Sequence, residues 1–229
     1  VSKETKIDIL VTPLVTIGSG VAVSALLAPT LGAIAMKVGD LIMLATNLQP
    51  FWMGIAVSVL VGVALTLPIS SAAICAAFGL TGLAGGAAVA GCCAQMVGFA
   101  VMSFRENKWG GLVSQGIGTS MLQMGNIIKN PRIWIAPIVT SAITGPLATC
   151  LFKLQMNGTP VSSGMGTCGL VGQIGVYTGW MNDIEAGTKT IDWIGLILIS
   201  FVLPAVLCPL INMVVRKLGW VKDGDMTLS

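Results

Sequence analysis

The feature that most constrains this chain is a run of 64 residues, from Leu41 to Phe104, that contains no Asp, Glu, Lys or Arg. A soluble domain of this size would have to expose much of that run to water. A bilayer removes the difficulty, because its interior is a solvent for apolar side chains. Only 9% of the residues are charged, whereas about a quarter are charged in a typical soluble domain. The chain is therefore predicted to be an integral membrane protein.

The hydrophobic runs favour membrane-spanning helices over a β-barrel. One helix crosses a bilayer with roughly 20 apolar residues, whereas barrel strands show short alternating segments. The 29 glycines and 10 prolines suit membrane helices that pack closely or break beside a cavity. Spans are predicted over roughly 9–35, 50–67, 83–104, 133–152 and 193–215, with 68–82 as a short break between two of them. Pro13 and Pro29 are expected to interrupt or end the first span.

The start of the chain bears on the number of spans. The first residue is Val1, and the polar residues that follow do not resemble a signal peptide. We expect one transmembrane domain over residues 1–229 that lacks further N-terminal helices, so five spans is a minimum.

Two basic patches bracket an interrupted apolar segment at 105–132. Arg105 and Lys108 open this segment, and Lys129 and Arg132 close it. Because Lys and Arg are favoured in cytoplasmic loops, both ends are expected in the cytoplasm. The sequence between them is broken by glycines and amides, which suits a re-entrant hairpin. We therefore predict a hairpin, and the alternative is a plain span that violates the positive-inside rule.

A second Gly-rich segment, at 164–181, is predicted to enter from the opposite face. Span 193–215 would run inward to a basic end, and the loop before it would lie outside. That loop carries Asp183, Glu185, Lys189 and Asp192. The sequence Gly-Leu-Val-Ser-Gln at 111–115 is echoed by Gly-Leu-Val-Gly-Gln at 169–173. Such paired interrupted segments are typical of transporter binding sites, although a short echo can also arise by chance.

Uncharged polar side chains in these segments are the candidate solute ligands. An amide offers donors and an acceptor without the desolvation cost of a charge. Gln115 and Gln173 are therefore predicted to bind a neutral hydroxylated solute, and the alternative for each is a hydrogen bond between helices. The supporting candidates are Gln95, Asn126, Ser70 and Ser71, with Gln123 as a weaker one.

Two residues near the second basic patch each have two interpretations. Arg132 could bind a phosphate or cap a helix, but a cytoplasmic topology signal is the preferred interpretation. Trp134 could stack on a sugar ring, but anchoring at the membrane interface is preferred.

The residue types present do not indicate catalytic or metal chemistry. The chain has no His, and its six Cys have no paired CxxC spacing, so they are interpreted as inert small hydrophobic residues. The carboxylates cluster in loops, and we expect no catalytic residues, no metal and no cofactor. Basic clusters with interleaved aromatics are missing from the sequence, so nucleic acid is not an expected partner.

Several long strings resemble the membrane-only EIIC-like family of the bacterial phosphotransferase system, whose members are described as sugar-permease subunits or as toxin regulators. The strings are TKIDILVTPLVTI at 5–17, LQPFWMGIAVSVL at 48–60, LTLPISSAAI at 65–74, GCCAQMVGFAVMSFRENKWGGL at 91–112, QGIGTSMLQMGNIIKNPRIWIAP at 115–137, GMGTCGLVGQ at 164–173 and KLGWVKDGDM at 217–226. The resemblance implies an all-α polytopic bundle, a homodimer, and a mobile part that carries two re-entrant hairpins.

The resemblance also implies a function. Full phosphotransferase permeases bind a sugar in the membrane, and a separate phosphorylated EIIB protein phosphorylates it. Their sugar sites commonly use a Glu and a His, and this chain has no His and no Glu inside a predicted span. We therefore expect a permease of the bacterial plasma membrane that moves a small neutral sugar or polyol by alternating access. The alternative is a membrane sensor that binds solute without transport, and any phosphorylation would need separate EIIB and EIIA proteins.

Overall fold

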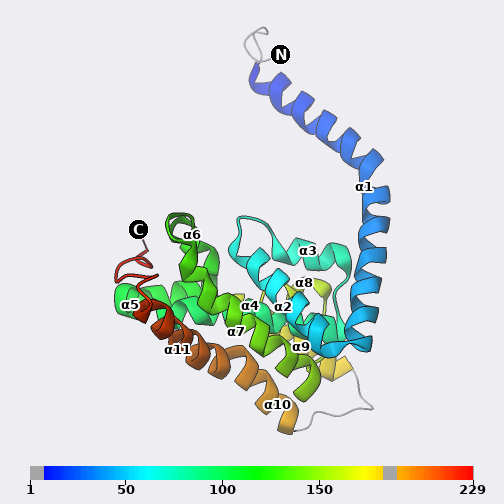
Figure 1. The fold of residues 1–229 in the computed structure, drawn as a ribbon. Coiled ribbons are helices and arrows are strands. Elements are labelled where there is room, and N and C mark those ends of the chain that lie inside the picture. The colour runs from blue at the N-terminus through cyan, green and yellow to red at the C-terminus, as the bar shows by residue number, and fades with distance from the viewer. Residues whose placement is uncertain (1–7, 183–189, 229) are drawn as a thin grey trace.

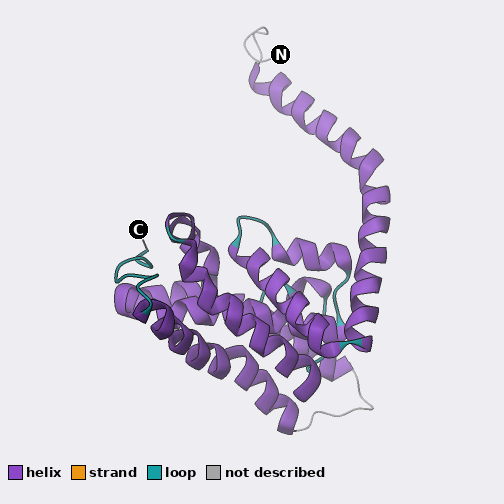
Figure 2. Ribbon diagram, viewed as in Figure 1, coloured by secondary structure: helices purple, strands orange, loops and turns teal. Residues whose placement is uncertain are grey.

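The structure is a computed structural model that describes residues 8–182 and 190–228. These residues form helices joined by short loops, and Figures 1 and 2 show from one side how the helices are arranged. Within the described ranges the only extended pairing is an isolated antiparallel bridge between Gly82 and Met156. The prediction of an all-α fold is confirmed.

The helices follow one another closely along the chain. The first half contains α1 (Asp8–Leu48), α2 (Pro50–Thr66), α3 (Ser71–Phe78), α4 (Gly82–Met102) and α5 (Phe104–Val113). The π-helical turn η1 (Ser114–Gly118), the 3-10 turn η2 (Ser120–Gln123) and α6 (Met124–Lys129) come next. One continuous helix then combines η3 (Pro131–Trp134), α7 (Ile135–Pro146) and η4 (Leu147–Leu151). The last elements are α8 (Pro160–Ser163), η5 (Cys168–Leu170), α9 (Val171–Asn182), α10 (Thr190–Ile197), η6 (Leu198–Val202) and α11 (Leu203–Lys217).

Three of the described helices are long and apolar enough to cross a membrane. They are Gly82–Met102, Pro131–Leu151 and Thr190–Lys217, and Pro50–Thr66 is a shorter apolar helix. Each matches a predicted span to within a few residues. The chain is therefore a multi-pass membrane protein.

The first helix differs from its prediction. We expected Pro13 and Pro29 to interrupt or end a span at 9–35, but α1 continues through both prolines to Leu48. Figure 1 shows α1 bent part way along, with its N-terminal half standing away from the bundle. Proline inside a helix removes one hydrogen bond and kinks the helix without always ending it. The C-terminal half of α1 packs on the bundle through Ile42 and Met43.

Helix α4 is the centre of the bundle, and every residue from Ala84 to Ala100 is buried. Small residues let its neighbours approach closely. A Cβ on Gly91 would lie 1.8 Å from the backbone oxygen of Ser58 in α2, and one on Gly98 would lie 2.3 Å from Cys208 Sγ in α11. Close backbone approach of this kind holds membrane helices together where lipid supplies no hydrophobic drive.

Hydroxyl groups reinforce the crossing of α2, α4 and α7. Ser58 Oγ donates to the backbone oxygen of Ser141 at 2.7 Å, and Ser141 Oγ lies 3.4 Å from the backbone oxygen of Gly91. All three residues are buried. A hydrogen bond between helices is favoured here, because no water reaches these groups.

The predicted cytoplasmic segments meet at one end of the bundle. Arg216 Nη2 lies 2.8 Å from Glu106 Oε1, and Asn130 Nδ2 donates to Asp225 Oδ2 at 2.8 Å. The Arg132 guanidinium lies 5.6 Å from the centre of the Trp220 ring. Both basic patches therefore lie beside the basic C-terminal end of α11, as the positive-inside rule requires.

Candidate functional site

The segment from Phe104 to Lys129, here called the first hairpin, folds back on itself. The extended residue Thr119, at φ −160° and ψ 142°, separates η1 from η2. Near one end, Asn107 Nδ2 donates to the backbone oxygen of Met226 at 2.8 Å. Near the other end, Asn126 Nδ2 donates to the backbone oxygen of Thr227 at 3.0 Å. Both ends therefore lie against neighbouring residues of one C-terminal tail (residues 218–228), as a hairpin requires and a plain span does not.

The segment 153–182, here called the second hairpin, closes at the other end of the bundle. A Cβ on Gly179 would lie 2.9 Å from the backbone nitrogen of Asn157, so the two limbs touch. The ring of Trp180 in α9 lies 5.2 Å from that of Trp193 in α10. The loop predicted to lie on the outer side of the membrane contains Asp183, Glu185 and Lys189, and these three residues are not among those that the structure describes.

The two hairpins meet in the interior. Thr167, in the second hairpin, donates from Oγ1 to the backbone oxygen of Gly116 in the first, at 2.6 Å. Thr167 is fully buried, and its Oγ1 also lies 3.6 Å from Met96 Sδ in α4. The two interrupted segments thus reach one another beside α4. Their sequence echo does not extend to conformation, because Gly169 and Leu170 have φ of 52° and 59° while residues 111–113 are helical.

Gln95 lies on α4 near this junction and is fully buried. Its Oε1 accepts from Trp134 Nε1 at 2.9 Å and from Thr66 Oγ1 at 3.3 Å. Thr66 Oγ1 also lies 2.8 Å from Ser120 Oγ in η2, which brings the first hairpin to the same cluster. Gln95 Nε2 is buried and has no hydrogen-bond partner. A buried amide donor without a partner is costly, so it marks a place where a bound molecule would gain a hydrogen bond.

Gln115 is also fully buried, but its amide is occupied. Nε2 donates to Ser103 Oγ at 2.9 Å and to the backbone oxygen of Gly111 at 3.0 Å. Oε1 accepts from Gln123 Nε2 at 2.9 Å. In this conformation the Gln115 amide therefore binds its own hairpin and the end of α4.

Asn126 joins the same network through Gln123. Asn126 Nδ2 donates to Gln123 Oε1 at 2.8 Å, and Gln123 Nε2 donates to the backbone oxygen of Met226 at 3.0 Å. Gln123 is the link between the two predicted residues Gln115 and Asn126, although the sequence made it only a weak candidate. Gln123 and Asn126 are three residues apart, and this helical spacing indicates that the two side chains can meet. The bond from Gln123 to Met226 joins residues 103 positions apart, so no local sequence pattern indicates it.

Gln173 lies in α9 beside Cys93 of α4. Its Nε2 lies 3.2 Å from Cys93 Sγ, and its Oε1 is buried without a hydrogen-bond partner. No hydrogen bond joins Gln173 to Gln115 among the described residues. The structure therefore does not pair the two main candidates.

The two serines of the predicted break have different surroundings. Ser70 is exposed, and its Oγ accepts from the backbone nitrogen of Ala73 at 3.1 Å, which caps α3. Ser71 is buried, and its Oγ donates to the backbone oxygen of Gly164 at 2.7 Å. The first residue of α3 is thereby attached to the second hairpin.

Two cavities open elsewhere on the molecule. One of about 230 Å³ lies near the ends of α1 and α4, with Asn47, Thr81, Gln155 and Asn157 in its lining. The other, of about 480 Å³, lies between α4 and α11. Neither of these two cavities is lined by any of the six predicted solute ligands.

Comparison with known proteins places this arrangement in a family. No curated protein and no solved structure matches the chain significantly. The family model described as "Phosphotransferase system, EIIC" matches residues 1–228. EIIC proteins are the sugar-permease subunits that work in the membrane with other components of that system. The long apolar helices, the two hairpins and this match over the whole chain show that the protein belongs to the phosphotransferase system EIIC family.

Proposed function

We propose that this chain binds a small neutral hydroxylated solute, a sugar or polyol, and translocates it by alternating access of the two hairpins. The observation that carries the proposal is the junction at Thr167 and Gly116, where segments from opposite ends of the bundle meet beside α4. Opening of this junction toward one end or the other would expose a central site alternately to the two sides.

The proposed ligands are amides beside α4. Gln95 offers a free donor at Nε2, and Gln173 offers a free acceptor at Oε1. Sugar hydroxyls can both donate and accept, so they can bind either amide without any buried charge. Gln115 and Asn126 are proposed to join when the first hairpin moves, because their present bonds are to that hairpin, to the end of α4 and to the tail. Ser71 and Ser70 are proposed to contribute from the break before α3.

Family membership also supports a proposal for the assembly and the location. We propose a homodimer in the bacterial plasma membrane, with a separate EIIB protein docking on the end that carries the basic patches. The N-terminal half of α1 stands away from its own bundle (Figure 1), and its exposed Ile17 and Val21 suit contact with lipid or a second copy. Phosphorylation of the solute would come from that separate protein, since this chain contains no His.

The test is uptake of a panel of labelled sugars and polyols into vesicles that contain the purified protein, with and without phosphorylated EIIB proteins. Gln95→Leu keeps a side chain of similar size but removes the amide. We expect it to lower uptake at least tenfold, because a site built to hydrogen-bond a hydroxyl loses that bond. Gln49→Leu is the matched control, since Gln49 is an exposed glutamine outside the core.

The outcomes separate the two functions. Uptake that falls in Gln95→Leu and stays normal in Gln49→Leu supports the permease. Saturable binding without uptake, under all EIIB conditions, would indicate a sensor instead. Binding and uptake that are unchanged in Gln95→Leu and in Gln173→Leu would contradict the proposed site.

A further inference from the structure

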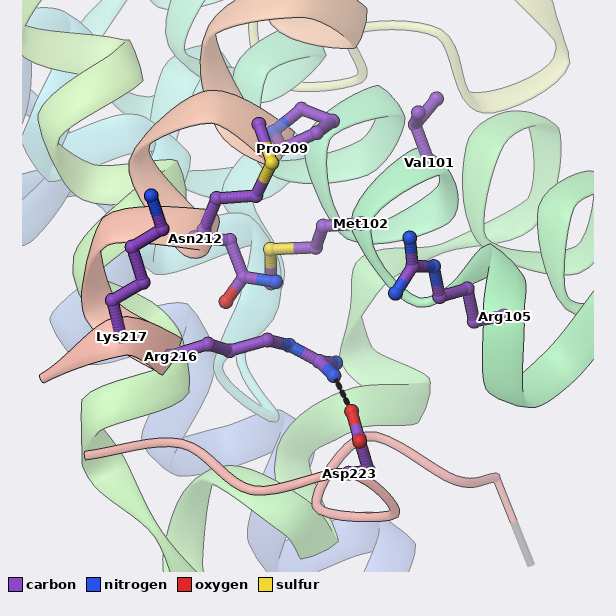
Figure 3. Close-up of a pocket in the computed structure, with 9 residues that line it drawn as sticks. Val101, Met102, Arg105, Pro209, Asn212, Arg216, Lys217 and Asp223 are labelled. Atoms are coloured by element: carbon purple, nitrogen blue, oxygen red, sulfur yellow. Dashed lines mark hydrogen bonds and ion pairs between the residues drawn. The ribbon is translucent and has the colours of Figure 1, made fainter. Parts of the chain in front are cut away.

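The larger cavity lies between α4 and α11, at the end of the bundle where the basic patches gather. It has a volume of about 480 Å³, and one part of its lining is apolar and another part cationic. The apolar part is Val101 and Met102 of α4 with Pro209 and Met213 of α11. The polar part is Arg105, Asn212, Arg216, Lys217 and Asp223 (Figure 3).

The charges around this cavity do not balance. Arg216 is ion-paired with Glu106 at 2.8 Å and with Asp223, so its charge is compensated. Arg105 and Lys217 are exposed, and neither forms an ion pair with a described residue. In the view of Figure 3 these two cations lie on opposite sides of the Asn212 side chain. Three cations and two carboxylates therefore surround the cavity, which leaves one net positive charge.

Asn212 supplies the second observation. It is only 4% exposed, its side chain lines the cavity, and its Oδ1 is buried without a hydrogen-bond partner. The Nε of Arg216, in the same lining, is also buried without a partner. Buried polar groups are normally satisfied, so two unsatisfied groups in one wall indicate that something else satisfies them.

We propose that this cavity binds a phosphate group, with Arg105, Lys217 and the unpaired Nε of Arg216 as cationic partners and Asn212 as an amide partner to the rest of the ligand. Guanidinium and ammonium groups are the usual protein partners of phosphate oxygens. The two carboxylates nearby, Glu106 and Asp223, already bind Arg216 and leave the other cations free. The site lies away from the hairpin junction, so it does not rest on the proposed solute site.

The position of the cavity favours the headgroup of an anionic phospholipid as the source of that phosphate. Basic pockets between helices at the cytoplasmic surface bind such headgroups, and the apolar lining on α4 and α11 suits the start of an acyl chain. A soluble phosphate has the same chemistry, and the experiment separates the two sources.

The experiment measures the association of spin-labelled phosphatidylglycerol, relative to phosphatidylcholine, with the protein in phosphatidylcholine nanodiscs. Each cation near an anionic headgroup strengthens binding about fivefold, so Arg105→Gln with Lys217→Gln should lower the selectivity about 30-fold. Asn212→Leu, which removes only the amide, should lower it about fivefold. Lys108→Gln with Lys222→Gln is the control, because it removes two exposed cations of the same end that do not line the cavity.

Titration of the same nanodiscs with inorganic phosphate is the second arm. Lipid selectivity that falls in the cavity variants but not in the control supports a lipid headgroup. Phosphate binding without lipid selectivity, lost in the same variants, supports the site with a soluble ligand. The proposal is overturned if neither probe binds, or if the control variant loses as much as the cavity variants. Retention of the folded state is checked by gel filtration for each variant.

Discussion

The hydroxyl of Thr167 donates a 2.6 Å hydrogen bond to the backbone oxygen of Gly116, and this bond joins the two hairpins inside the bundle. The two residues are 51 positions apart, and their segments close at opposite ends of the bundle. A contact of this kind would have to break whenever the two hairpins move apart.

The first prediction concerns that contact. Thr167→Val keeps the shape of the side chain but leaves the oxygen of Gly116 without its donor. We expect the free energy of unfolding to fall by about 1–3 kcal/mol, the usual cost of a lost buried partner. Thermal unfolding in nanodiscs measures the change. The control is Thr178→Val, because Thr178 is exposed and bonds only within its own helix, to Ile174. An equal loss of unfolding free energy in the two variants would show that the bond between the hairpins stabilises the protein no more than a bond within one helix.

The second prediction concerns the crossing of α2 and α4. Gly91→Ala places a methyl group 1.8 Å from the backbone oxygen of Ser58, so the helices must separate. We expect a loss of about 1–3 kcal/mol in the free energy of unfolding, measured in mixed micelles with increasing denaturing detergent. Gly125→Ala is the matched control, because nothing lies within 4 Å of the added methyl group. In α6 that change should be neutral or stabilising by about 1 kcal/mol. A Gly91→Ala protein with the same free energy of unfolding as the wild type would contradict the close crossing of α2 and α4.

The third prediction concerns topology. Single cysteines introduced as Lys108→Cys and Lys129→Cys, in a background without the six native cysteines, should react with an impermeant reagent from the same side of the membrane. Asn157→Cys, in the second hairpin, should react from the other side. Labelling of positions 108 and 129 from different sides would mean that the first hairpin spans the membrane.

The fourth prediction concerns pH. The backbone N–H of Lys222 holds the pKa of Asp225 below its ordinary value of 3.8, with help from the Asn130 amide and from the nearby charges of Lys222 and Arg216. The carboxylate contributes stability to the tail above that ordinary value, and the contribution is lost as the pH falls through the lowered pKa. Hydrogen exchange of the Lys222 amide, corrected for its intrinsic pH dependence, should therefore show full protection at neutral pH and loss of it only under strongly acid conditions.

Asp225→Asn is the comparison for this pH effect. It removes the titrating group, so protection of Lys222 should become weaker and independent of pH. A wild-type protein whose tail opens already near neutral pH would contradict the assignment of this carboxylate.

Local sequence features were sufficient for four of the five predicted spans and for the folding back of the segment 105–132, whereas the second hairpin begins at 153 and was predicted only from 164. The charge-free run located α4, and the basic residues at 105–108 and 129–132 indicated that the segment between them turns back. These features act within one segment, so a single sequence displays them. The end of α1 was predicted wrongly, because a proline in a membrane helix can be accommodated by a bend, and the surroundings decide this.

Local sequence patterns do not indicate the hydrogen-bond partners of the polar side chains. Gln95 and Gln115 have the same side chain and are both buried, yet one keeps a free donor and the other is saturated. The difference depends on Trp134 in η3, on Gln123 in η2 and on Ser103 between α4 and α5, which only the fold brings beside these amides. Hydropathy also does not report which face of an apolar helix meets protein, because lipid and protein interiors are equally apolar.

The C-terminal tail has a mechanical consequence for any movement of the first hairpin. Asn107 binds both Met226 and Leu228, and Asn126 binds Thr227. One short segment of the tail therefore holds together the two ends of the first hairpin. The limbs therefore cannot spread apart at that end while the segment stays in place. If the tip of the first hairpin moves, its two limbs must then tilt together, and α11 must move with them.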